Sequence, residues 1–442
     1  MNDTNLTLGD RLTQVLRHLG ISRAHIAGCM FADLGDLLTA HPETVASLTL
    51  IGFPPFDVDT VKPLGSRLLL IHGDQGPIGS LLSDLSPQLP EAAKVTLPQY
   101  AVLSWSDFIR DHSKRIGTAV SAFLERMSQE SSPDEIPLSS GEGEVAGITY
   151  RVEGNGPPIV LLPLMLAPSQ WESLIPRLSP HYCTVTLGGA HLGAIPWMEE
   201  RAGSPSYIGM AHSLVDAARL RPGDSLLEVG CGSGAVLRRV AQYLGGANPV
   251  TGVDINRYLL REAAELIRRD GLETHIRLEE GNAEDLPFPD NSFDLVFSAT
   301  VMEEVNADNM MNELLRVTKP GGKVAAIVRA ADIPFWVNVP ASAELKSKVA
   351  TFPIGASSGE GGCEDASLYR RFRQAGLSEI RMEPQFASFG PGQILYGGVV
   401  PTILNRLSPE EAENYRSAIR QAKAEGTLLA SWPHHTAIGT KP

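Results

Sequence analysis

Short apolar runs alternate with longer stretches of mixed polarity along most of the chain. In the first part of the chain, strands are predicted over residues 25–28, 48–51, 68–72 and 94–97. In the last part, strands are predicted over residues 225–229, 250–254, 275–279, 293–298 and 323–329. Amphipathic stretches between these runs predict helices, and regular alternation of strands with helices indicates parallel sheets. We therefore expect an α/β protein with two doubly wound, mostly parallel sheets.

Composition divides the chain into three blocks. Residues 129–142 are rich in Ser, Pro and Glu, too polar to bury, and predict a linker. A second seam lies near residues 201–205, after which a new strand pattern begins. The blocks are therefore 1–128, 143–200 and 201–442. A chain of 442 residues is long enough for two to four domains.

Charge and apolar content exclude several classes of partner. The chain carries 37 basic and 51 acidic side chains, a net charge of −14, so nucleic acid is not expected as a partner. The longest apolar stretch, Ile159–Ala167, is about half the ~20 residues that a membrane span needs. No secretory signal is visible, and we expect a cytoplasmic protein. The four cysteines form no C-x-x-C pair, which predicts neither disulfides nor a metal site.

A glycine-rich turn follows the first predicted strand of the last block. Residues 226–234 read L-L-E-V-G-C-G-S-G, with an acid at Glu228 and glycines at Gly230, Gly232 and Gly234. Glycines without Cβ atoms permit a sharp turn and let a ligand approach the backbone at a helix N-terminus. Asp254 ends the next predicted strand, where a carboxylate can accept both hydroxyls of a ribose. The pair suggests a nucleoside-containing cofactor, although such turns also serve only for packing.

Four segments in order extend this pattern. They read E-V-G-C-G-S-G, G-V-D-I-N, G-N-A-E-D-L-P-F-P-D-N-S-F-D and V-T-K-P-G-G-K-V. Together they resemble the class I S-adenosylmethionine-dependent methyltransferases, nearest to the quinone and sterol methylases, over about residues 205–440. The resemblance implies a Rossmann-like enzyme domain that binds S-adenosylmethionine and methylates a small molecule.

The resemblance also implies roles for single residues. Glu228 and the backbone of Gly230, Gly232 and Gly234 would hold the methionyl part of the cofactor. Asp254 would bind the ribose and Ile255 would lie on the adenine face. Asn282 and Ala283 correspond to contacts with the adenine amino edge, although Asp is commoner than Asn there. Ser298 begins the segment after the fourth strand, whose tip faces the methyl group in this fold.

Methyl transfer is an in-line displacement that depends mainly on alignment and exclusion of water. Where the acceptor needs a base, Glu303 and Glu304 are the nearest candidates by position. The alternative is that both are solvated carboxylates at a helix start. His212, His434 and His435 either line the pocket or have structural roles.

The front of the chain resembles a different family. Residues 24–52 look like the nucleophile-elbow region of the α/β-hydrolase fold, but the elbow reads Gly28-Cys29-Met30-Phe31-Ala32 and contains no serine. Cys29 as a shifted nucleophile has no His-Asp pair to activate it. Residues 146–190 resemble the start of a hydrolase, so the two halves are reversed. We expect one circularly permuted, catalytically degenerate domain; two unrelated partial domains or a swap between protomers are the alternatives.

Three hypotheses of function follow. The first is a methyltransferase for a small-molecule acceptor, with a non-catalytic hydrolase-like module that shapes the acceptor site, forms a homodimer or docks a partner. The second is a non-catalytic protein that binds S-adenosylmethionine as a regulatory ligand, and the third is a hydrolase. The sequence does not distinguish oxygen, nitrogen and carbon acceptors.

Overall fold

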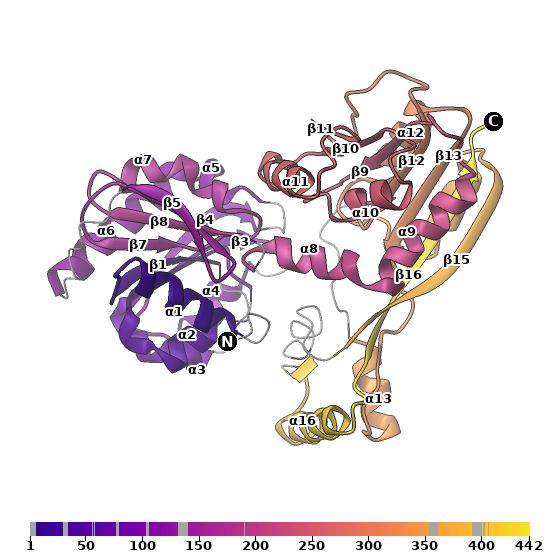
Figure 1. Cartoon of the computed structure of the whole chain (residues 1–442). Coiled ribbons are helices and arrows are strands. Elements are labelled where there is room, and N and C mark those ends of the chain that lie inside the picture. The colour runs from indigo at the N-terminus through magenta and orange to yellow at the C-terminus, as the bar shows by residue number, and fades with distance from the viewer. Residues whose placement is uncertain are drawn as a thin grey trace. The chain divides into compact units, whose positions relative to one another are not determined.

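The chain forms two compact units, Met1–Pro196 and Trp197–Pro442, each with its own sheet (Figure 1). The computed structural model describes residues 6–29, 34–54, 56, 58–76, 79–102, 106–130, 140–189, 191–352, 361–390, 400, 403, 404 and 406–442. Both sheets are mostly parallel and carry helices, so the expected α/β class is confirmed.

Both front blocks contribute strands to the first sheet, whose order is β4-β3-β2-β1-β7-β8-β6-β5. The strands are β1 Ala24–Gly28, β2 Val45–Ile51, β3 Leu68–Gln75, β4 Ala93–Ala101, β5 Gly141–Val145, β6 Ile148–Glu153, β7 Pro158–Leu161 and β8 Cys183–Gly188. The ladders of β6 with β5 and β8 are antiparallel, and the other five are parallel. Every residue of β1 and β2 is buried, as expected for central parallel strands covered on both faces.

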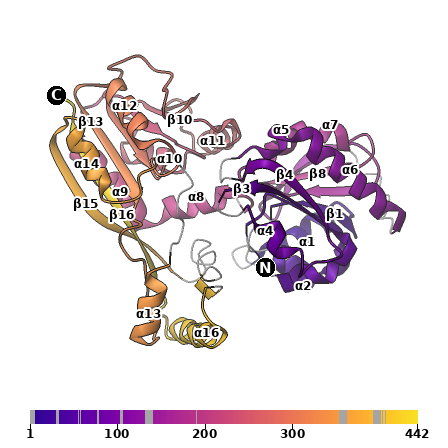
Figure 2. The same cartoon turned by 180° about the vertical axis from the view of Figure 1, so that it is seen from behind.

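Helices cover both faces of this sheet (Figure 2). They are α1 Leu8–His18, α2 Leu34–Ala40, α3 Val58–Val61, α4 Leu81–Leu85, α5 Phe108–Asp111, α6 Ser113–Glu130 and α7 Ile175–Leu178. One core holds apolar side chains of α1 and α2, and the other holds those of α5 and α6. Residues 131–139 of the predicted linker lie outside the described residues, while its two ends belong to α6 and β5.

The second sheet has the order β11-β10-β9-β12-β13-β16-β14, and β15 pairs with β16. Its strands are β9 Leu226–Val229, β10 Val250–Asp254, β11 Ile276–Glu280, β12 Phe293–Ala299, β13 Thr318–Arg329, β14 Trp336–Val337, β15 Ser378–Phe389 and β16 Ala430–Thr440. Strands β9 to β13 are parallel, and β16 runs antiparallel to β13. The chain order reverses direction between β9 and β12, where doubly wound sheets bind ligands outside the carboxyl ends of the strands.

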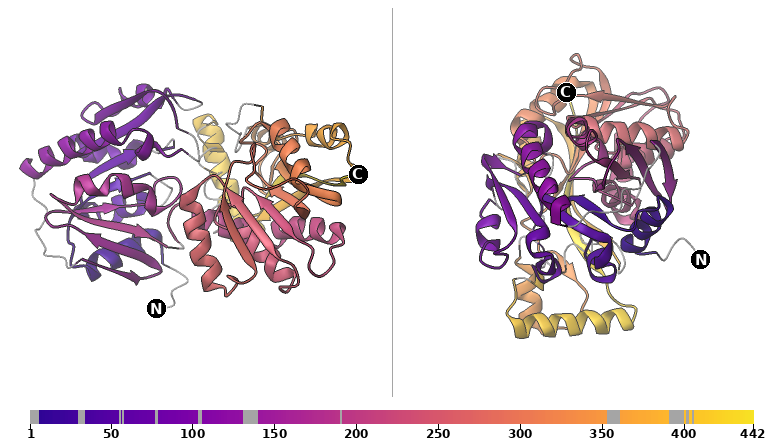
Figure 3. Two further views of the ribbon diagram at one scale, coloured as in Figure 1. Left: turned by 90° about the horizontal axis from the view of Figure 1, so that it is seen from above. Right: turned by 90° about the vertical axis from the view of Figure 1, so that its left-hand side faces the viewer.

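Two layers of helices sandwich the second sheet (Figure 3). The helices of this unit are α9 Pro205–Ala218, α10 Ala235–Tyr243, α11 Arg257–Arg269, α12 Ala307–Val317, α13 Ala343–Ala350, α14 Ser367–Gln374 and α16 Pro409–Ala424. Side chains of α9 and α10 pack on one face, and those of α12 and α14 pack on the other. Helices α13 and α16 share a separate small core with β14. Helix α8, Ala194–Gly203, precedes α9.

Candidate functional site

The carboxyl ends of β9, β10 and β12 surround the glycine-rich turn. Gly230, Gly232 and Gly234 all adopt positive φ angles, and Gly234 precedes the first residue of α10. At Gly230, φ is 76° and an added Cβ would lie 2.2 Å from a methyl carbon of Val301. A side chain at this position is therefore excluded by both conformation and space. The turn leaves the N-terminus of α10 at the ligand edge of the sheet.

Asp254 joins the turn to the end of the neighbouring strand. Its Oδ2 accepts a hydrogen bond from the Gly232 N–H at 2.8 Å, and its Oδ1 accepts one from the Asn256 N–H at 2.8 Å. Burial raises the pKa of this carboxyl, while the two backbone N–H groups act to lower it. A carboxylate can accept about four hydrogen bonds, so these two leave acceptor capacity for a ligand.

Glu228 lies on the β9 side of the same edge and is 2% exposed. Its Oε2 is buried and has no hydrogen-bond partner. Burial raises the pKa of Glu228 well above its ordinary value, the Asp254 charge adds to this rise, and the Arg201 charge opposes it. A buried carboxyl oxygen without a partner is costly, which favours a ligand-binding role for Glu228.

The other residues predicted to contact a cofactor lie at the ends of their strands. Ile255 follows β10 and is 61% exposed. Asn282 follows β11 and accepts a hydrogen bond from the Glu284 N–H at 3.0 Å, while the neighbouring Ala283 is buried. These positions are compatible with the predicted contacts, which stay predictions.

Ser298 is buried near the end of β12, and its Oγ has no partner. Its neighbour Phe297 packs on the α9 side, as does the β9 residue Leu226. Because side chains alternate along a strand, Ser298 lies on the α12 side of the sheet and Glu228 lies on the α9 side. The two predicted contacts are thus on opposite faces of the sheet.

Glu303 is fully buried in the turn before α12, whose N-cap is Asn306. Its Oε1 accepts a hydrogen bond from the Arg329 N–H at 2.6 Å, beyond the last pair between β12 and β13, Ala299 with Ile327. Glu303 therefore accepts a hydrogen bond from a backbone N–H of β13 that lies beyond the end of the ladder between β12 and β13. The alternative of a solvated helix-start carboxylate is wrong for Glu303, because Asn306 caps the helix and the glutamate points inward.

Burial raises the pKa of Glu303 to about 7, although Arg329 acts to lower it. Its Oε2 is buried and has no hydrogen-bond partner. Glu304 is different, because its Oε1 accepts a hydrogen bond from Arg329 Nη2 at 2.7 Å. A general base works best with a pKa near the working pH and a free oxygen, so Glu303 fits this role better than Glu304.

Arg201 and Tyr207 were not anticipated from the sequence, and they lie beside His434. The Arg201 guanidinium lies 5.0 Å from the centre of the Tyr207 ring, whose edge-to-face neighbour at 5.5 Å is the His434 ring. Tyr207 is fully buried and its hydroxyl has no partner. Burial lowers the pKa of His434 to about 3, and Arg201 contributes to this shift. Arg201 falls within the seam predicted at residues 201–205, so the sequence did not single it out.

The two other histidines of this unit have defined neighbours. His212 stacks on Tyr243 of α10, with ring centres 4.0 Å apart, and burial lowers its pKa. His435 binds the Tyr369 hydroxyl through Nδ1 at 2.8 Å and Asp332 through Nε2 at 2.7 Å. Whether either histidine lines the pocket or has a structural role stays a prediction.

In the first unit, Cys29 is buried and burial raises its pKa to about 12, so the thiol stays protonated at neutral pH. Met30, Phe31 and Ala32 of the predicted elbow lie outside the described residues. His112 lies between α5 and α6, because α5 ends at Asp111 and α6 begins at Ser113. Its ring packs edge-on against Tyr100, with ring centres 4.5 Å apart.

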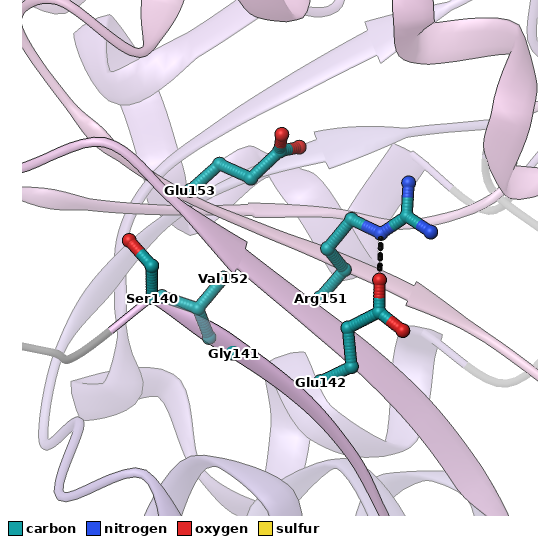
Figure 4. A pocket seen from close by; sticks show the side chains of 6 residues that line it. All are labelled: Ser140, Gly141, Glu142, Arg151, Val152 and Glu153. Carbon is teal, nitrogen blue, oxygen red and sulfur yellow. Dashed lines mark hydrogen bonds and ion pairs between the residues drawn. The ribbon is translucent and has the colours of Figure 1, made fainter.

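Figure 4 shows a hollow on the β5 and β6 hairpin, lined by residues 140–142 and 151–153. It contains an ion pair between Arg151 Nε and Glu142 Oε1 at 2.7 Å, but both side chains are more than half exposed. We assign it no function. Among the described residues, no cluster of three potential metal ligands occurs, and no helix is long and apolar enough to span a membrane. The four cysteines are free thiols.

The residues at this edge of the second sheet are similar in sequence to known methyltransferases. The sequence model described as "Methyltransferase domain" matches residues 227–326. The ubiquinone/menaquinone biosynthesis C-methyltransferase of Shewanella pealeana is 35% identical over 114 residues, 26% of this chain and 45% of that protein. The demethylmenaquinone methyltransferase of Lactobacillus johnsonii is 36% identical over 157 residues, 35% of this chain and 59% of that protein. A sterol 24-C-methyltransferase of Gibberella zeae is 36% identical over 113 residues, 25% of this chain and 29% of that protein.

Two solved structures illustrate a distant likeness in fold. The YcgJ protein of Bacillus subtilis covers 53% of this chain with 98% of its own, at 17% identity and a TM-score of 0.36. A geranyl diphosphate methyltransferase in complex with GPP and sinefungin covers 53% of this chain with 78% of its own, at 17% identity and a TM-score of 0.32. At these scores the likeness adds nothing to the fold already described. The chain spans about half the length of the curated relatives that it matches. The predicted resemblance is therefore supported over residues 227–326, the part of the chain that matches the methyltransferase-domain model.

Proposed function

We propose that this protein is an enzyme that transfers a methyl group from S-adenosylmethionine to a small-molecule acceptor. One observation carries the proposal. The buried Glu228 carboxyl, with an unpartnered oxygen, lies beside the glycine turn of a domain that matches the methyltransferase family.

The residues at this edge fit the cofactor in shape and chemistry. The Gly230 to Gly234 turn leaves the backbone open to a ligand. Asp254 has acceptor capacity for ribose hydroxyls, and Glu228 offers an unpartnered carboxyl oxygen to the ammonium group of the methionyl part. The exposed Ile255 side chain, next to Asp254, presents an apolar surface for the adenine ring.

The bound cofactor would supply an electrophilic methyl group on a positively charged sulfur. The protein's share of the reaction is alignment and exclusion of water, which the buried ends of β9 and β12 support. Glu303 would accept a proton from the acceptor at Oε2, because its Oε1 is held by the Arg329 N–H. The raised pKa of Glu303, about 7, suits a base at neutral pH.

Carbon is the acceptor atom that the relatives favour, since two of those named above are C-methyltransferases. Where the acceptor carbon belongs to a phenol or quinol ring, the new C–C bond forms as the methyl group leaves sulfur, and a proton is lost from the conjugated hydroxyl or from that carbon; this gives Glu303 a reason to be a base.

For the first unit we propose a non-catalytic, hydrolase-like fold that shapes the acceptor site, forms a homodimer or docks a partner. If the strands are renumbered so that β5 to β8 become strands 1 to 4 and β1 to β4 become strands 5 to 8, their order across the sheet is 1-2-4-3-5-6-7-8. Both front blocks therefore build one continuous sheet. This supports a single permuted domain over two partial domains. The protonated, buried Cys29 argues against the shifted thiol nucleophile.

Calorimetric titration with S-adenosylhomocysteine tests the cofactor site. Asp254→Asn is expected to abolish or greatly weaken binding, whereas Glu273→Gln, which changes an exposed acid of the same unit, is not. Transfer of labelled methyl groups to a panel of quinols, phenols and other small acceptors then tests catalysis. Tight binding without transfer to any acceptor favours the regulatory binding protein, and absence of binding by the wild type refutes the proposal.

A further inference from the structure

The Glu303 carboxyl lies next to a guanidinium that does not form a hydrogen bond with it. Arg329 Nε is 3.6 Å from Glu303 Oε1, beyond hydrogen-bond distance, and it is buried without a hydrogen-bond partner in the described part of the chain. The backbone N–H of Arg329, and not its side chain, donates to Glu303 Oε1 at 2.6 Å. A fully buried carboxyl beside a cation thus keeps Oε2 unpaired, although an arginine fork commonly binds both oxygens of a carboxylate.

The neighbouring carboxylate, that of Glu304, accounts for this arrangement. Arg329 Nη2 donates a hydrogen bond to Glu304 Oε1 at 2.7 Å. The Arg329 side chain is 26% exposed and that of Glu304 is 22% exposed, so solvent only partly screens the pair. A guanidinium is planar and rigid, so a contact that holds Nη2 also fixes the position of Nε. Glu304 therefore keeps the cation at its present distance from Glu303 and supplies its counter-ion.

Three other segments bring charged or titratable groups close to this turn. Glu284 Oε1 accepts a hydrogen bond from the backbone at the start of α12, at 3.1 Å. Cys363 donates its N–H to the turn itself, and burial raises the pKa of its thiol. His434 is the ladder partner of Arg329, and burial lowers its pKa to about 3. Near pH 7 the thiol and the imidazole are therefore neutral, and among these groups Arg329 with its counter-ion sets the charge beside Glu303.

We propose that Glu304 is a positioning residue for Glu303: it holds the Arg329 guanidinium away from that carboxyl, so that Oε2 stays free to accept the proton of the methyl acceptor. The inference rests on the proposed function and extends it to Glu304, which is itself the poorer base. Without the Glu304 carboxylate, the guanidinium can close the gap and pair with both oxygens of Glu303. Such a pair favours the ionised form of Glu303 and covers Oε2, which makes Glu303 a weaker base.

Carbon-13 NMR of the full-length protein, labelled at the glutamate carboxyl carbon, follows the titration of Glu303 without any acceptor. The signal that disappears in Glu303→Gln is assigned to this residue. In the wild type we expect its midpoint at a pH of about 7. Glu304→Ala should lower the midpoint by about 1 to 2 pH units, because the cation moves closer. Glu304→Gln, which keeps an acceptor for Arg329 Nη2 but not the charge, should titrate between the two.

Two variants at Arg329 test whether Glu304 acts through this cation. Arg329→Met should raise the midpoint of Glu303 by about 1 pH unit, because the cation is lost. The double variant Glu304→Ala/Arg329→Met should titrate within about 0.5 pH unit of Arg329→Met alone. Misfolding would instead move the midpoint toward 4.5 in both single variants, so shifts of opposite sign also exclude that explanation. As a matched control, Glu265→Ala breaks an exposed ion pair of the same unit and should leave the midpoint unchanged.

Methyl transfer to whichever compound of the acceptor panel reacts gives a second measurement. In Glu304→Ala the rise of kcat/KM with pH should move to lower pH, and its plateau should fall by about 10-fold or more because Oε2 is covered. An unchanged midpoint in Glu304→Ala, or an equal fall caused by Glu304→Ala when Arg329 is already Met, would overturn the inference. If the midpoints shift as expected but the wild type transfers no methyl group to any acceptor, the arrangement of charges is confirmed and the proposed function fails.

Discussion

Replacing Glu303 by Gln removes a buried carboxyl while keeping its shape and its acceptor oxygen for the Arg329 N–H. In the native protein the pKa of Glu303 is raised by burial from 4.5 to about 7. Below pH 4.5 the group is protonated in the folded and unfolded chains alike. As the pH rises from 4.5 to 7, only the unfolded chain loses the proton, so the free energy of unfolding falls. Glu303 therefore stabilises the fold least above pH 7.

The size of this effect follows from the shift. A rise of 2.5 pKa units, 7 minus 4.5, corresponds to about 3.4 kcal/mol in full and to about 2.5 kcal/mol between pH 5 and pH 8. The free energy of unfolding of Glu303→Gln, relative to that of the wild type, should thus rise by about 2.5 kcal/mol between pH 5 and pH 8. Urea denaturation at both pH values measures it, with hydrogen exchange of peptides from β12 and β13 to follow the second unit alone.

The same variant separates a structural carboxyl from a catalytic one. If Glu303 is the base, kcat/KM for methyl transfer rises with pH through about 7 in the wild type, and Glu303→Gln lowers it by about 100-fold or more while S-adenosylhomocysteine still binds. Wild type and variant stability curves that run parallel between pH 5 and pH 8 would refute the reasoning about burial. If Glu303→Gln is more stable than the wild type and keeps full activity, Glu303 is not the base and only pairs with the N–H at the end of β13.

Two further predictions concern the glycine turn and α10. Gly230→Ala should lower the free energy of unfolding by about 2 kcal/mol or more and abolish S-adenosylhomocysteine binding, because the new Cβ meets Val301. Gly223 also has a positive φ but open space around it, so Gly223→Ala measures the cost of backbone strain without a clash. Arg238→Met should lower the free energy of unfolding, measured by heat or urea, by about 2 kcal/mol, because it leaves two partly buried carboxylates without a cation. As a control, Arg268→Met breaks only an exposed ion pair and should change the free energy of unfolding by less than about 0.5 kcal/mol.

Local sequence pattern was sufficient for the sheet and the glycine turn. The strand predicted over residues 250–254 coincides with β10, and the other four of the last block lie within one residue of β9, β11 and β12 or inside β13. Strands β9 and β12 are buried almost throughout, so their apolar runs are easily read, whereas β11 at the edge of the sheet mixes apolar with charged residues and is mostly exposed or half-buried. The front strands behave alike: the four predicted there lie inside β1 to β4.

The polar part of the site depends on contacts between distant segments, which a local pattern does not contain. Glu303 was placed at a helix start by its distance from the strand, but Asn306 takes the cap and turns the glutamate inward. Arg201 stands in a segment that read as a seam because a new strand pattern begins after it. Its position depends on Glu199, which binds Arg238 some 40 residues later.

The buried titratable groups at the end of β13 oppose one another. The folded pKa of His434, about 3, lies below its ordinary value of 6.5, so this histidine contributes stability that is complete above pH 6.5 and is lost as the pH falls toward 3. Glu303 has the opposite effect, because its contribution to the free energy of unfolding falls as the pH rises from 4.5 to 7. Arg329 connects the two groups. Its N–H donates a hydrogen bond to Glu303, and its partner in the ladder with β16 is His434. Near pH 6, the fold thus holds a neutral imidazole and a mostly protonated carboxyl on either side of one strand end. Both groups therefore carry less charge in the folded chain than they would in water, because burial disfavours the charged form of each.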